Sequence, residues 1–140
     1  MPPVPPLWIR HCACSVIGKM DELHLRAVDY DIVGITESWG TDDISDAELN
    51  LPGFQLFRND RNTRGGDLLY VSEAVEAVHM EDIPTFGFAD CIWCKLCIHG
   101  IKLIVGVCYR SPVSSSVNDE ALLLMFNSVG ELADASTWEI

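Results

Sequence analysis

The sequence has no apolar run of about 18 residues, the length at which a stretch becomes a candidate membrane-spanning helix. Its N-terminus also lacks the basic region, apolar segment and small-residue cleavage site that together make a secretory signal peptide. These absences predict an intracellular protein, nuclear or cytoplasmic, that is neither secreted nor bound to a membrane.

Basic residues are also scarce. The chain of 140 residues has 9 Lys and Arg against 21 Asp and Glu, which gives a formal net charge of −12. Affinity for nucleic acids comes largely from Lys and Arg that neutralise phosphates, so this balance works against unaided binding to a polyanion. Any nucleic-acid function must depend on a local basic patch, or on parts of a protein outside this chain.

Hydrophobic residues, by contrast, make up 49% of the sequence. This content and the chain length predict one globular domain with a buried core, of the α/β or α+β class. The proline-rich opening, residues 1–6, predicts an extended tail because proline has no backbone N–H to donate. The domain is therefore expected to cover residues 7–140.

Six cysteines could suggest a disulfide framework, but they lie in apolar runs, so we expect reduced, buried thiols. The spacing Cys91-x-x-Cys94-x-x-Cys97 superficially resembles a zinc or redox motif. On a strand, however, residues three apart point to opposite faces, and residues six apart are separated by roughly 20 Å. A shared zinc ion is therefore the alternative that the strand pattern disfavours.

Hydrophobic patterning predicts an ordered series of elements. These are a strand at 7–11, a helix at 15–29, a buried strand at 31–37, an acidic loop at 40–53, a hairpin of strands 54–58 and 68–71, a second hairpin of strands 91–98 and 102–109, and a helix from 121 to about 132. Polar side chains at 114–120 offer capping groups ahead of the last helix.

Two motifs stand out, Thr-Glu-Ser-Trp at 36–39 and Tyr-Arg-Ser-Pro at 109–112. They belong to an ordered series of segments at residues 19–23, 31–39, 46–54, 57–61, 64–66, 69–71, 92–95 and 105–112. Together these segments resemble the endonuclease domain of jockey-like non-long-terminal-repeat retrotransposons. A single one of these motifs would be weak, but the ordered series covers most of the chain and is specific.

The resemblance implies a partial four-layer α/β sandwich of the endonuclease/exonuclease/phosphatase type, which hydrolyses DNA phosphodiesters with a divalent metal, usually Mg²⁺. Glu37 occupies the position of the family's metal-binding glutamate, and Mg²⁺ prefers carboxylate and water oxygens. Tyr109 matches a tyrosine near the scissile phosphate, to which its hydroxyl can donate a hydrogen bond. The simpler alternatives are a solvated strand end for Glu37 and a surface tyrosine with a polar tip for Tyr109.

Arginines supply the expected contacts to DNA. Arg58, Arg61 and Arg64 form a basic cluster on the turn of the first hairpin, where side chains can reach a backbone phosphate. Arg110 follows Tyr109 and can contact phosphate in bidentate fashion. A solvated turn is the alternative for the hairpin cluster.

The sequence also departs from the family pattern. Cys12-Ala13-Cys14-Ser15 replaces an Asn-Ala-Arg-Ser type motif, and a thiol is a poor substitute for an amide oxygen near Mg²⁺. The family's Asp-x-Asn motif, its later aspartate and its terminal histidine would all lie beyond Ile140. The resemblance thus predicts the N-terminal half of the domain, either an incomplete endonuclease or an inert remnant that acts as a binding module.

Half of a two-sheet sandwich has a further expected consequence. Strands such as 32–35 and 103–107 are apolar enough for burial on both faces, so we expect a lone half to expose an apolar face and to self-associate.

Overall fold

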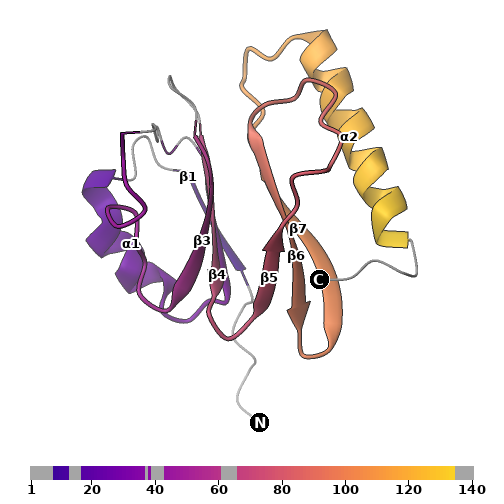
Figure 1. The fold of residues 1–140 in the computed structure, drawn as a ribbon. Helices are drawn as coiled ribbons and strands as arrows, with labels where there is room; N and C mark the ends of the chain where they lie inside the picture. The colour runs from indigo at the N-terminus through magenta and orange to yellow at the C-terminus, as the bar shows by residue number, and fades with distance from the viewer. Residues whose placement is uncertain (1–7, 13–16, 37, 39–42, 61–65, 135–140) are drawn as a thin grey trace.

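The computed structural model describes residues 8–12 by their backbone and residues 17–36, 38, 43–60 and 66–134. The elements in chain order are strand β1 (Trp8–Cys12), a short 3₁₀ turn η1 (Ile17–Lys19), helix α1 (Met20–Ala27), strands β2 (Ile32–Thr36), β3 (Phe54–Asn59), β4 (Asp67–Ser72), β5 (Glu76–His79), β6 (Cys91–Ile98) and β7 (Ile101–Cys108), and helix α2 (Ser116–Asp134) (Figure 1). The mixed α/β class predicted from the sequence is confirmed.

The strands form two sheets. The first sheet has the order β1-β2-β4-β3, in which β1 and β2 are parallel and β4 is antiparallel to both of its neighbours. The second sheet, β5-β6-β7, is antiparallel throughout. Both predicted hairpins are therefore confirmed, whereas β5 was not predicted because its four residues are largely exposed and carry little apolar pattern.

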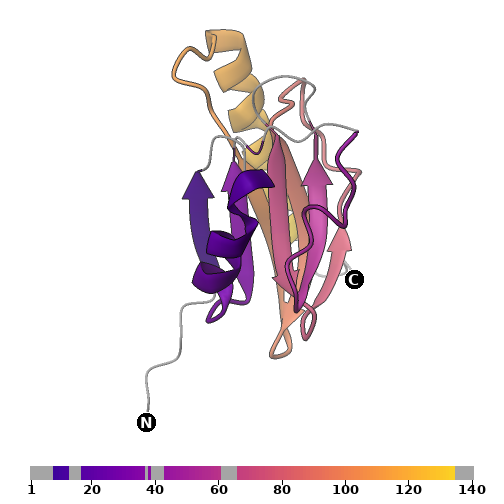
Figure 2. The same cartoon turned by 90° about the vertical axis from the view of Figure 1, so that its left-hand side faces the viewer.

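The two sheets stack face to face, with α1 on the outer face of the first sheet and α2 on the outer face of the second (Figures 1 and 2). Strand alternation explains this layering, because successive side chains of a strand point to opposite faces. On β4, Leu68 and Tyr70 pack under α1, whereas Leu69 and Val71 pack between the sheets. On β6, Trp93 faces α2.

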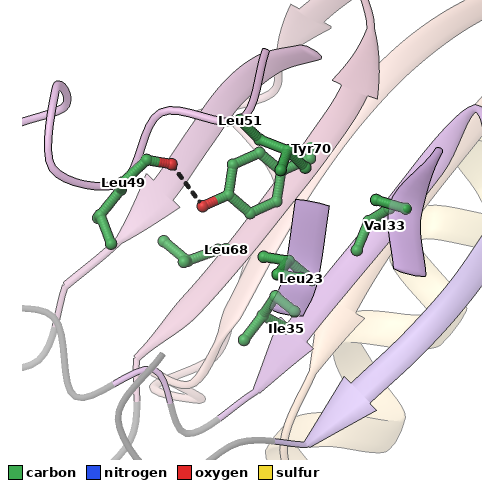
Figure 3. Close-up of a cluster of buried hydrophobic side chains, with 8 residues drawn as sticks. Leu23, Val33, Ile35, Leu49, Leu51, Leu68 and Tyr70 are labelled. Atoms are coloured by element: carbon green, nitrogen blue, oxygen red, sulfur yellow. Dashed lines mark hydrogen bonds between the residues drawn. The ribbon is translucent and has the colours of Figure 1, made fainter. Parts of the chain in front are cut away.

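The core under α1 surrounds Tyr70, which points from β4 towards the helix and the loop that carries Leu49 (Figure 3). Helix α1 contributes Leu23 and Ala27, and β2 contributes Val33 and Ile35, all of them buried. Hydrophobic spacing in 20–27 therefore gives the helix one buried stripe, although the helix is shorter than predicted.

The expected bare inner face is not observed for residues 32–35. Ile32 is buried and Val107 of β7 is partly buried between the sheets, while Val33 and Ile35 are buried under α1 on the opposite face. The expectation was wrong on this point because the chain holds strands of both sheets, so their inner faces cover each other. Exposed apolar side chains lie elsewhere, for example Phe126 on α2. Self-association stays a prediction.

The sequence predicts no membrane-spanning helix. Among the described residues, neither helix has the length and apolar character needed to cross a membrane.

Candidate functional site

One end of the sandwich gathers strand ends from both sheets. Strand register places Thr36 of β2 opposite Asp67 of β4, and Asp67 opposite Asn59 of β3. In the second sheet, Cys91 at the start of β6 lies opposite Cys108 at the end of β7.

Asn59 ties the two sheets together at this end. Its side-chain amide donates to the carbonyl oxygens of Ala89 at 2.8 Å and Cys91 at 2.9 Å. These bonds fix the start of β6 against the end of β3, so the strand ends of both sheets share one surface. We call this surface, with Thr36, Asn59, Asp67, Asp90 and Tyr109, the polar end of the sandwich.

Asp67 is the most perturbed acid of the polar end. It is fully buried, and burial, with repulsion from Asp90, raises the pKa of its carboxyl to about 9. Asp67 therefore holds its proton at neutral pH. Its Oδ2 lies 3.5 Å from the Asn59 amide nitrogen, whereas its Oδ1 has no hydrogen-bond partner among the described residues.

Asp67 was not among the predicted site residues, although its place in the sequence is unusual. An aspartate opens a strand that is otherwise apolar, Asp-Leu-Leu-Tyr-Val at 67–71. Thr36, opposite it, is also buried, and its hydroxyl has no partner within the part of the chain that the structure describes. The Thr36 hydroxyl and the Asp67 Oδ1 atom thus each lack a hydrogen-bond partner among the described residues, which carries a desolvation cost.

Glu37, the predicted metal ligand, lies outside the described residues. Its neighbours Thr36 and Ser38 are both buried at the polar end. The Ser38 N–H donates to the Gly66 carbonyl at 3.1 Å, which joins the segment after β2 to the residue before β4.

Tyr109 lies at the same end. It is partly buried, follows β7 directly, and its backbone N–H donates to the Asp90 carbonyl at 2.9 Å. The Asp90 side chain in turn accepts a hydrogen bond from the Gly66 N–H at 3.2 Å. These bonds connect the backbone of Tyr109, which follows β7, through Asp90 to Gly66, which precedes β4.

Arg58, one of the predicted DNA contacts, is held by carboxylates of its own chain. Its guanidinium donates to Asp60 at 2.9 and 3.0 Å and to Asp46 at 2.9 Å, and its side chain is only 17% exposed. It also donates to the Ile44 carbonyl at 2.8 Å, so it fastens the acidic loop to β3. Arg61 and Arg64 lie outside the described residues.

Arg110 is paired as well. It donates to the two carboxylate oxygens of Asp119 at 2.8 and 2.9 Å, across the turn that leads into α2. This guanidinium, and a hydrogen bond from Ser114, hold the pKa of Asp119 below its usual value. Contact of Arg58 or Arg110 with DNA stays a prediction, and it would require each to exchange a carboxylate for a phosphate.

The described residues contain no group of three or more His, Cys, Asp or Glu side chains arranged to hold a metal ion. Asp67 fits Mg²⁺ poorly, because this ion keeps several waters and a fully buried, protonated carboxyl leaves no place for them. Cys91 and Cys94 lie on opposite faces of β6, Cys91 towards α2 and Cys94 between the sheets, as the strand argument predicts.

No family model matches the chain, and no curated protein matches it significantly. The resemblance to the retrotransposon endonuclease domain stays a prediction from the sequence motifs.

Proposed function

We propose that the chain has the four-layer sandwich of the endonuclease/exonuclease/phosphatase type and belongs to the class of metal-dependent DNA endonucleases, as found in retrotransposons. One observation supports this best. Three hydrogen bonds connect Ser38 to Gly66, Gly66 to Asp90 and Asp90 to Tyr109. They link Ser38, the residue that follows Glu37 in the sequence, to the backbone of Tyr109 across the two sheets.

The proposed roles follow from the side chains. The Glu37 carboxylate binds Mg²⁺ weakly, with water as the remaining ligands, because a single carboxylate makes a poor site for this ion. The Tyr109 hydroxyl donates a hydrogen bond to a phosphoryl oxygen of bound DNA. Arg58, Arg61, Arg64 and Arg110 are the proposed phosphate contacts.

These groups alone do not complete a hydrolytic site, and we propose that the chain by itself cuts DNA little or not at all. The resemblance assigns water activation and leaving-group stabilisation to an Asp-x-Asn motif, an aspartate and a histidine that have no matching positions here. Cys12 stands where the family has an asparagine.

A second candidate function is an inert module that binds a partner without catalysis. The ion pairs of Arg58 and Arg110 favour it, because both guanidinium groups are neutralised within a chain of net charge −12. Such a chain has weak electrostatic attraction for DNA.

Calorimetric titration with Mg²⁺ tests the metal assignment. We expect a dissociation constant of about 1 mM or weaker, since one carboxylate and water make the site. Glu37→Gln should abolish the heat, whereas Asp43→Asn, which removes an exposed carboxylate of the acidic loop, should leave it unchanged. Micromolar binding, or equal heats from wild type and Glu37→Gln, would contradict the assignment.

Nicking of supercoiled plasmid separates the two candidate functions. We expect the wild-type chain with Mg²⁺ to nick no faster than Glu37→Ala. Nicking that requires both Mg²⁺ and Glu37 would show that the chain is an active endonuclease and would exclude the inert module.

A further inference from the structure

Cys91 and Cys108 are directly opposite each other across the β6–β7 ladder. The next pair outward, Asp90 and Tyr109, is joined by the 2.9 Å bond from the Tyr109 N–H to the Asp90 carbonyl. Hydrogen-bonded and non-bonded pairs alternate along an antiparallel ladder, so Cys91 and Cys108 form a non-bonded pair. The Cα atoms of such pairs are about 4.5 Å apart, within the range of about 4.4 to 6.8 Å that disulfides require.

The two side chains share the face of the sheet that packs against α2. A side-chain hydrogen bond already joins their thiols, and both cysteines are free. The other described cysteines have no such neighbour, because Cys94 is opposite Val105 and Cys97 is opposite Lys102. Cys91 and Cys108 are therefore the one cross-strand thiol pair among the described residues.

The two sulfurs differ in accessibility and in pKa. Cys91 is buried, and its sulfur lies 3.7 Å from both the Phe88 carbonyl oxygen and the Met125 sulfur of α2. Cys108 is only partly buried and ends its strand, so it is the more accessible sulfur. The hydrogen bond between the thiols lowers the pKa of Cys91 and raises that of Cys108. The pair thus releases one proton more readily than an isolated buried thiol, and the thiolate is the reactive form.

We propose that Cys91 and Cys108 are a redox-active dithiol, which a small-molecule disulfide such as oxidised glutathione converts into a cross-strand disulfide. The Cys91 thiolate accepts the proton of the more accessible Cys108 thiol, and the Cys108 sulfur attacks one sulfur of the glutathione disulfide and releases one glutathione thiolate. Cys91 then gives this proton to the released thiolate, attacks the Cys108 sulfur of the mixed disulfide and releases the second glutathione. The protein loses two thiol protons and two electrons, and the electrons reduce the glutathione disulfide to two thiols.

Oxidation changes the contact between β6 and α2. A disulfide holds its two sulfurs about 2 Å apart, so any movement of the Cys91 sulfur towards Cys108 alters its 3.7 Å contact with the Met125 sulfur. The redox state of the pair is therefore linked to the packing of α2. The proposal does not depend on nuclease activity, because it rests on the β6–β7 ladder alone.

Peptide mapping of the full chain tests the proposal directly. The protein is equilibrated in glutathione buffers of increasing oxidised-to-reduced ratio, quenched in acid, unfolded, alkylated and analysed by mass spectrometry. We expect a cross-linked peptide pair that joins Cys91 to Cys108, with alkylation lost at both positions over the same range of ratios. Cys94 should remain alkylated throughout. Separate glutathione adducts without this cross-link, or cross-links that involve other cysteines instead, would overturn the proposal.

Two single variants give a second measurement. Cys91→Ser removes the resolving sulfur, so the mixed disulfide on Cys108 should accumulate by at least tenfold over wild type. Cys94→Ser, a matched change at a buried cysteine of the same strand, should leave the Cys91–Cys108 cross-link intact. Absence of a mixed disulfide in a folded Cys91→Ser chain would contradict the proposed order of attack. Should that variant not fold, the wild-type map decides alone.

Discussion

Tyr70 and Asp67 lie three residues apart on β4 and are both fully buried, but their polar atoms differ in hydrogen bonding. The Tyr70 hydroxyl donates to the Leu49 carbonyl at 2.7 Å (Figure 3). The Asp67 Oδ1 has no partner among the described residues. Burial keeps both groups protonated, since it raises the pKa of the Tyr70 hydroxyl and of the Asp67 carboxyl. The tyrosine recovers in a short hydrogen bond what it loses in hydration, whereas Asp67 has a long 3.5 Å contact with the Asn59 amide at Oδ2 and an unsatisfied Oδ1.

The core around Tyr70 therefore stabilises the fold, whereas the polar end lowers its stability. The core around Tyr70 is apolar apart from one satisfied hydroxyl, whereas the polar end places Asp67 next to a second acid, Asp90. Unsatisfied or repelling buried groups are costly and cluster at functional sites, which agrees with the proposal that the polar end is the site. Three substitutions test this difference, taken from the largest expected effect to the smallest.

Tyr70→Ala should lower the free energy of unfolding by about 3 to 5 kcal/mol, as truncation of a buried aromatic ring does. The ring fills the core under α1, and its loss leaves a cavity lined by leucines. Urea denaturation measures the change. Tyr30→Ala is the control, because Tyr30 packs on the same core but is only partly buried. An equal loss in both variants would mean that the core is not centred on Tyr70.

Asp67→Asn should stabilise the protein by about 1 to 3 kcal/mol at mildly alkaline pH, because the amide, unlike the carboxyl, cannot ionise in the unfolded chain. The folded chain holds the Asp67 proton up to a pKa of about 9, whereas the unfolded chain releases it near the ordinary value for aspartate. Stability from this proton is complete in acid and is lost as pH rises towards 9.

The Asp67→Asn chain should therefore show a flatter decline of unfolding free energy between about pH 4 and about pH 9 than wild type. Denaturation at several pH values measures the slope. Asp43→Asn, at an exposed acid, should leave the slope as it is. A wild-type stability that rises with pH across this window would refute a protonated Asp67.

Tyr70→Phe should cost only about 0.5 to 1.5 kcal/mol, the net value of one hydrogen bond. The ring and its packing remain, and the Leu49 carbonyl loses its donor. Comparison with Tyr70→Ala divides the contribution of the residue into packing and hydrogen bonding. No change in the urea midpoint would mean that water replaces the hydroxyl at Leu49.

Sequence patterns predicted the fold best where one face of an element is buried. The strands near 32–36 and 67–72 and both hairpins have apolar runs or alternation that only a sheet satisfies. Strand β5 gave no such signal, because its pairing with β6 comes from backbone hydrogen bonds and not from its side chains. Helix α2 begins at Ser116, earlier than the predicted start at residue 121, because the Ser115 hydroxyl accepts the Asn118 N–H at 3.1 Å and caps the helix there.

The candidate site was less predictable. Motifs singled out Glu37 and Tyr109, but nothing in sequence spacing shows that Asn59 reaches across to Cys91, since this contact depends on how two sheets stack. The contacts of the arginines were equally hard to predict from the sequence. Their positions suggested phosphate contacts, whereas carboxylates distant in sequence, such as Asp46, occupy the guanidinium of Arg58.

One glycine of β7 has a consequence for how this sequence can change over generations. Gly106 is opposite Trp93, and a methyl group at position 106 would lie 2.3 Å from the Trp93 ring. The ring also meets Phe126 of α2 edge-on, with centroids 6.3 Å apart, so it has little freedom to move aside. Substitutions at positions 93 and 106 are therefore coupled. Among descendants of this chain, a larger residue at 106 should survive only where a smaller one has already replaced the tryptophan.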